Sequence, residues 1–96
     1  MSNFSFDVGK LIDMCRQNDV AMVGIFGSQA TGEAKDQSDI DLLIRFSKRK
    51  SLLKVVALER QLSEALGKKV DLLTEAALSP YLRDRVLRDL QVIYEA

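Results

Sequence analysis

The 96-residue sequence contains no histidine, a single cysteine and a single proline, and no excess of charge of either sign. Without histidine the chain has no imidazole general base, no histidine-ligated metal and no Ser-His-Asp triad. Any catalysis would therefore depend on carboxylates, hydroxyls, amines and the backbone. A lone cysteine, Cys15, excludes a disulfide within the chain. We expect it to be a buried thiol, which fits a reducing cytoplasm.

The charge balance limits the partners of the protein. Fourteen basic residues are matched by fourteen acidic ones, so the chain lacks the basic field that drives stable binding to duplex nucleic acid. The sequence has no signal-peptide pattern, and its apolar runs are far shorter than a membrane span. We expect a soluble cytoplasmic protein that does not bind a membrane or form a stable complex with duplex nucleic acid.

The length fits one domain that spans residues 1–96, near the lower end of the usual size range. A domain of this size buries only a modest core. A large substrate surface would have to come from a partner protein or from association into a homo-oligomer.

Apolar residues at helical spacing predict two amphipathic helices, over residues 5–17 and 52–66. Gly67 is placed to end the second helix, whose leucine-rich stripe from Leu52 to Leu66 we assign to the core. Ser79 followed by Pro80 predicts the start of a further helix. The buried side of that helix is expected to consist of Leu82, Val86 and Leu90.

Short apolar or alternating runs predict strands at residues 20–26, 39–46, 70–74 and 91–94. Between the first two strands, the small and polar residues 28–38 predict a turn, a short helix and a loop. The alternation of helices and strands indicates an α/β fold, with a small mixed β-sheet and helices packed mainly on one side.

The segment that indicates chemistry lies at the start of the second predicted strand. A turn bracketed by Gly27 and Gly32 is followed, after six residues, by Asp39-Ile40-Asp41. Because side chains alternate along a strand, Asp39 and Asp41 should point to the same face. Paired carboxylates are hard oxygen ligands of the kind that suits Mg²⁺, which also binds water and phosphate oxygens.

A third carboxylate, Asp71, lies on the next predicted strand. If that strand neighbours the strand of Asp41, the acids could converge at one end of the sheet and hold two metal ions about 3.5–4 Å apart. Gly27 and Ser28 would offer backbone N–H groups and a hydroxyl to a phosphate.

A purely structural interpretation is that Asp39 caps a turn, Asp41 is solvated and Asp71 ends a strand. We favour the functional interpretation, because an acid on the strand just after the glycine turn serves no evident packing purpose, and because metal and triphosphate would offset the repulsion among clustered carboxylates.

The same residues resemble the Gly-Ser and Ser-Asp-x-Asp signature of minimal nucleotidyltransferases, members of the DNA polymerase β superfamily. The matching segments are Gly27-Ser28, Gly32, Ser38-Asp39-Ile40-Asp41 and, for the third acidic strand, Val70-Asp71-Leu72. The resemblance implies that Gly27 and Ser28 bind the triphosphate of ATP or another nucleoside triphosphate. It implies that Asp39 and Asp41 ligate Mg²⁺, and that Asp71 is the third ligand and the base. Many members carry arginine where this chain has Thr31, so a positive charge is missing beside the phosphate site.

The resemblance also implies an activity, the transfer of a nucleoside monophosphate to an acceptor hydroxyl with release of pyrophosphate; AMP is the expected group. Members of the family resemble the antitoxin that pairs with a HEPN-domain ribonuclease toxin, so we expect a HEPN-type partner. One hypothesis is an adenylyltransferase that modifies this partner. The alternative is a catalytically weak module that neutralises the partner by stoichiometric capping. A small-molecule transferase is a weaker third hypothesis, because 96 residues leave little material for an acceptor pocket.

Overall fold

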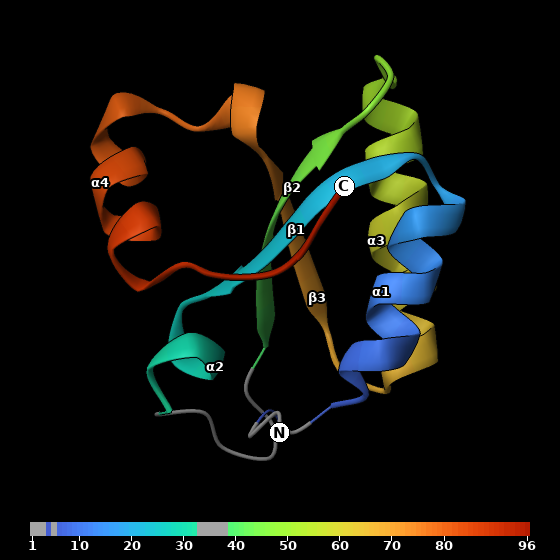
Figure 1. Cartoon of the computed structure of the whole chain (residues 1–96), viewed down its shortest axis with the longest axis horizontal. Coiled ribbons are helices and arrows are strands. Elements are labelled where there is room, and N and C mark those ends of the chain that lie inside the picture. Colours follow the sequence, from blue (N-terminus) through green and yellow to red (C-terminus); the bar gives the residue numbers. More distant parts are fainter. Residues whose placement is uncertain (1–3, 5, 33–38) are drawn as a thin grey trace.

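The computed structural model describes residues 4, 6–32 and 39–96, which form a four-stranded sheet in the order β3-β2-β1-β4 (Figure 1). The strands are β1 (Val20–Phe26), β2 (Ile40–Phe46), β3 (Val70–Thr74) and β4 (Gln91–Glu95). β1 is antiparallel to β2 and β4, whereas β2 and β3 are parallel. The sheet is mixed, as expected, and each strand lies within one residue of its predicted bounds.

Two helices, α1 (Val8–Gln17) and α3 (Leu52–Leu66), cover one face of the sheet (Figure 1). The main core lies between these helices and the strands. Its buried side chains are Leu11, Cys15, Val20, Val23, Ile25, Ile40, Leu42, Ile44, Leu58, Leu62, Val70 and Leu72. The expected packing of helices mainly on one side is confirmed, and so is the burial of Cys15, which is 0% exposed.

Capping residues set the ends of these helices. α1 starts at Val8 rather than near residue 5, because the Asp7 side chain accepts a hydrogen bond from the Lys10 N–H at 3.0 Å and caps the helix there. α3 ends at Gly67, which adopts a left-handed conformation with φ of 69°. The predicted stop at Gly67 is confirmed.

The assignment of the whole α3 stripe to the core was wrong at its first residue. Leu58 and Leu62 are buried, whereas Leu52 is 76% exposed. Leu52 lies in the first turn of the helix and borders an open hollow instead of the sheet.

The opposite face of the sheet carries one helix, α4 (Pro80–Asp89), which follows the short helix η1 (Glu75–Ala77). The Ser79 hydroxyl accepts from the Leu82 N–H and caps α4, as predicted. The predicted buried stripe was wrong in part, since only Val86 is buried, in a small cluster with Met22 and Leu43. Leu82 is 45% exposed, and Leu90 is half-buried in extended backbone after the helix.

One short element remains, the single-turn helix α2 (Ser28–Thr31). It confirms the short helix expected after β1, while the loop expected next, over residues 33–38, lies outside the described residues. Within the part of the chain that the structure describes, each helix is too short or too polar to cross a membrane.

Candidate active site

The parallel pairing of β2 with β3 places two of the predicted acids side by side. Asp41 and Asp71 are partners in the register, one step from the pair Leu42 and Leu72. Because those leucines belong to the core under α1 and α3, alternation puts both aspartates on the opposite face, the one that α4 partly covers. The pairing that the sequence analysis assumed is therefore confirmed.

Asp39 is the residue before β2, and it is exposed. It lies two positions from Asp41 along the chain, and its charge acts on the Asp41 carboxyl. β2 and β3 both begin at the same end of the sheet, the end at which α2 lies beside β2 (Figure 1). The three aspartates therefore gather at this end.

The acids of this group influence one another electrostatically. Burial raises the pKa of Asp41 above its ordinary value, and the charges of Asp71 and, less strongly, Asp39 raise it further. Nearby, the Lys69 ammonium lies 4.0 Å from Asp71 Oδ1, and because Lys69 is exposed and Asp71 is half-exposed, this ion pair is weak. The site has an excess of negative charge.

The side chains do not form a closed metal cage in their present rotamers. Among the described residues, three or more acidic or cysteine side chains are nowhere close enough together to hold a metal ion. Asp41 and Asp71 are already adjacent in the register of the two strands. Their carboxylates can therefore converge by a change of side-chain rotamers, and the strands do not have to move.

Gly27 occupies the bend between β1 and α2, directly against Asp41. Its φ and ψ are 72° and −151°, a region that is nearly exclusive to glycine. A Cβ atom added at this position would overlap the Asp41 carboxylate. A glycine is thus required twice here, by the backbone conformation and by the close approach to the acid.

Ser28 begins α2, where the Ala30 and Thr31 N–H groups both donate to the Gly27 carbonyl at 3.1 Å. The Thr31 hydroxyl donates back to the Ser28 carbonyl at 3.4 Å. Because α2 has a single turn, its dipole is small. The turn can therefore offer a phosphate mainly its close backbone and the Ser28 hydroxyl.

Gln91 is a residue of this region that the sequence analysis missed. Its side-chain amide donates to the Ala30 carbonyl at 2.7 Å, which ties the start of β4 to the end of α2. The two residues are far apart in the sequence, and a glutamine at the start of a strand carries no local signal. Only the placement of β4 beside β1 reveals the contact.

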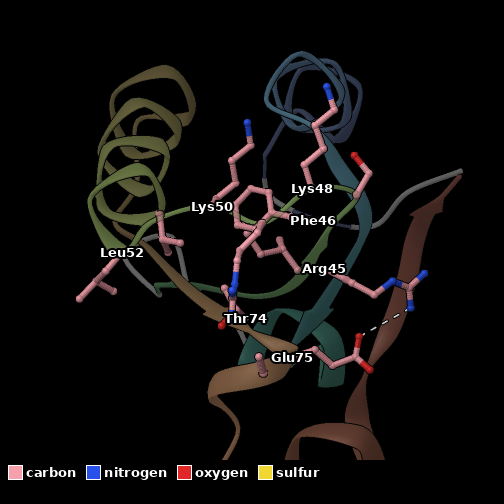
Figure 2. Close-up of a pocket in the computed structure, with 12 residues that line it drawn as sticks. Arg45, Phe46, Lys48, Lys50, Leu52, Thr74 and Glu75 are labelled. Carbon is pink, nitrogen blue, oxygen red and sulfur yellow. Dashed lines mark ion pairs between the residues drawn. The ribbon is translucent and has the colours of Figure 1, made fainter.

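A wide hollow lies elsewhere, at the far end of β2 and β3 from the aspartates. Figure 2 shows it between Leu52, Thr74 and a basic segment, with Arg45 Nη1 3.6 Å from Glu75 Oε2. It measures about 470 Å³. Lys50, in the basic segment formed by residues 48–50, forms an ion pair of 2.7 Å with Asp19. Because none of the three aspartates lines this hollow, its size alone does not make it the catalytic site.

The sequence matches the model of the family "Polymerase beta, Nucleotidyltransferase" over residues 9–96. The chain belongs to this family, and the match includes Gly27, Ser28 and all three aspartates. The four-stranded mixed sheet agrees with that assignment.

Two curated relatives are similar over most of their length. One is a chain of Methanocaldococcus jannaschii whose name places it provisionally among protein adenylyltransferases; it is 45% identical over 80 residues, or 83% of this chain and 86% of the relative. The other, the protein adenylyltransferase MntA of Thermococcus cleftensis, is 42% identical over 71 residues, or 74% of this chain and 72% of the relative.

Solved structures share the fold. A toxin–antitoxin structure with AMP-PNP aligns with a TM-score of 0.83 at 24% identity and covers 92% of this chain and 73% of that chain. A complex of the tri-AMPylated HEPN toxin of Shewanella oneidensis with an MNT antitoxin aligns at 0.74 and 22% identity, covering 92% and 69%. At these identities the likeness establishes the fold.

Proposed function

We propose that the chain transfers AMP from ATP to a hydroxyl group of a HEPN-type protein partner in the cytoplasm, with Mg²⁺ at Asp39, Asp41 and Asp71. The observation that supports this most is the contact of Gly27 with Asp41, beside Asp71. At this contact, the turn that suits a phosphate lies directly beside the carboxylates.

The residues at this point fit Mg²⁺ by their chemistry. All three are carboxylates, the ligands that hard cations prefer. The raised pKa of Asp41 reflects repulsion and burial that a divalent cation would offset. Coordination requires rotation of side chains only, because Asp41 and Asp71 are already adjacent in the register of β2 and β3.

Each residue of the proposed site has its own role in the reaction. Gly27 and Ser28 hold the triphosphate through the backbone and the hydroxyl. The acceptor oxygen forms a bond with the α-phosphorus, the bond to the bridging oxygen breaks, and pyrophosphate leaves. Asp71 takes the proton of the acceptor hydroxyl. When bound, Mg²⁺ neutralises charge on the phosphates and carboxylates.

The identity of the acceptor is supported by the named relatives. One is a protein adenylyltransferase, and a structure of the same fold is an antitoxin bound to an AMPylated HEPN toxin. A catalytically weak module that caps its partner is the second candidate, and the open arrangement of the three acids favours it.

The test is the transfer of label from α-labelled or γ-labelled ATP to a purified HEPN-domain partner, with Mg²⁺ or with EDTA. We expect the α-label alone to enter the partner, and EDTA or Asp41→Asn to abolish the transfer. Asp13→Asn, on the exposed side of α1, is the matched control. Absence of transfer by a folded wild-type protein that still binds the partner would contradict the enzyme and favour capping.

A further inference from the structure

A hollow between the end of β1 and α4 adjoins the proposed triphosphate site. It measures about 270 Å³. Its lining consists of Phe26, Gly27, Leu82, Arg85, Val86 and Asp89. Gly27 belongs to both sites, and Phe26 is the register partner of Asp41. The hollow therefore begins where the triphosphate site ends, on the face of the sheet that carries the acids.

The lining has the composition of a site for a flat organic group. Apolar side chains of Phe26, Leu82 and Val86 form its walls. Arg85 and Asp89 lie four residues apart and so on the same side of α4, where they add a cation and an acceptor. Apolar walls with a few polar groups are typical of small-molecule sites.

The dipole of α4 does not account for Asp89 at its end. Asp89 is the last residue of α4, where a negative charge opposes the helix dipole. Within the described residues, Arg85 and Asp89 take part in none of the ion pairs. Both side chains can therefore contact a ligand in the hollow, and the stability of α4 gives no reason for Asp89.

We propose that this hollow binds the nucleobase of the bound triphosphate and favours a purine with an exocyclic amino group, an inference that rests on the proposed function. The Arg85 guanidinium packs against the face of the purine. The Asp89 carboxylate accepts a hydrogen bond from the amino group. The triphosphate then extends past Gly27 toward the aspartates.

The chain offers a matched control for each variant on the same helix. Arg85→Ala and Asp89→Ala remove the two polar groups, whereas Arg83→Ala and Asp84→Ala change exposed residues of α4 that do not line the hollow. Val86, which anchors the helix, is unchanged in all four variants. Because Asp89 opposes the helix dipole, Asp89→Ala should not lower the melting temperature.

Binding is measured by calorimetry with three magnesium salts. ATP carries the complete ligand, purine riboside triphosphate lacks only the amino group, and inorganic tripolyphosphate lacks the nucleoside. Wild-type protein should prefer ATP to purine riboside triphosphate by about tenfold, and Asp89→Ala should lose most of this preference. Arg85→Ala should lower the affinity for both nucleotides by about threefold to tenfold. Neither variant should change the affinity for tripolyphosphate, and the control variants should match wild type.

Different outcomes separate this inference from the proposed function. Equal weakening of tripolyphosphate and ATP by Arg85→Ala would place Arg85 at the phosphates and overturn the base pocket. Unchanged nucleotide affinities in both variants would overturn it as well. If the wild-type protein binds tripolyphosphate and ATP with equal affinity, the proposed base site is overturned and the proposed function is not. If the wild-type protein binds neither ligand, both the proposed function and the proposed base site are overturned.

Discussion

At the scale of single residues, Gly27 is the position where fold and proposed chemistry depend on each other most directly. The residue ends β1 in a backbone conformation that other residues avoid, and it lies against the Asp41 carboxylate. Gly67 provides a comparison, since its φ of 69° is also left-handed but nothing lies within 4 Å of an added Cβ. Gly67 therefore shows the cost of a left-handed backbone alone, whereas Gly27 combines a conformation that is nearly exclusive to glycine with the close approach to Asp41.

We predict that Gly27→Ala destabilises the protein by about 1–3 kcal/mol and abolishes AMP transfer, because the new methyl group displaces Asp41. Gly67→Ala should cost about 1 kcal/mol and leave transfer intact. Urea unfolding and the α-label assay measure the two effects. Full activity of a folded Gly27→Ala protein would contradict the assigned role of Gly27.

Cys15 leads to a prediction about pH. Burial raises its pKa from 9.0 to about 12, so the thiol stays protonated in the folded state at pH values where the unfolded chain has lost the proton. The stability associated with this group is fully present below pH 9 and declines as the pH rises toward 12, by roughly 1.4 kcal/mol per unit. The unfolding free energy of wild type should therefore fall more steeply above pH 9 than that of Cys15→Ala. Parallel curves would show that the thiol ionises normally.

The sequence was sufficient to predict that Asp41 and Asp71 lie on successive strands and that a glycine turn follows β1, because these residues fall on a regular strand pattern or close together in the chain. Side chains alternate along each strand, so Asp41 and Asp71 lie on the face of the sheet away from the main core. It was not sufficient to predict the contact of Gly27 with Asp41 or the role of Gln91. Both depend on the register between strands, which local patterns do not specify.

At the scale of elements, the arrangement of β2, α3 and β3 positions the site. A helix that connects two parallel neighbouring strands is a common unit, and it brings Asp71 beside Asp41. Both strand patterns and the helix were predictable from hydrophobic periodicity. The extent of burial on α3 was not, because periodicity identifies a side of the helix but not how far the sheet extends beneath it. Leu52 fits the pattern and is nevertheless exposed.

Two leucines of α3 test the difference between the buried and the exposed part of this helix. Leu58 is fully enclosed in the main core, whereas Leu53 is 80% exposed. We predict that Leu58→Ala lowers the free energy of unfolding by about 2–5 kcal/mol, and that Leu53→Ala changes it by less than about 0.5 kcal/mol. Chemical denaturation of both variants measures the difference. A large loss in Leu53→Ala would mean that the first turn of α3 is covered in solution.

At the scale of the whole molecule, the two ends of the parallel strand pair differ in charge. Asp39, Asp41 and Asp71 lie where β2 and β3 begin. Lys48, Arg49 and Lys50 line the hollow where the strands end (Figure 2). The net charge of zero in the sequence conceals this separation. Net charge alone therefore could not locate the acidic end.

The intact mass of a HEPN-domain partner, purified after co-expression with wild type or with Asp41→Asn, tests the central claim most directly. We predict that the partner gains whole AMP increments with wild type and none with Asp41→Asn, while it co-purifies with both proteins. An unmodified partner that is bound and neutralised equally by wild type and Asp41→Asn would contradict catalysis and establish capping as the function.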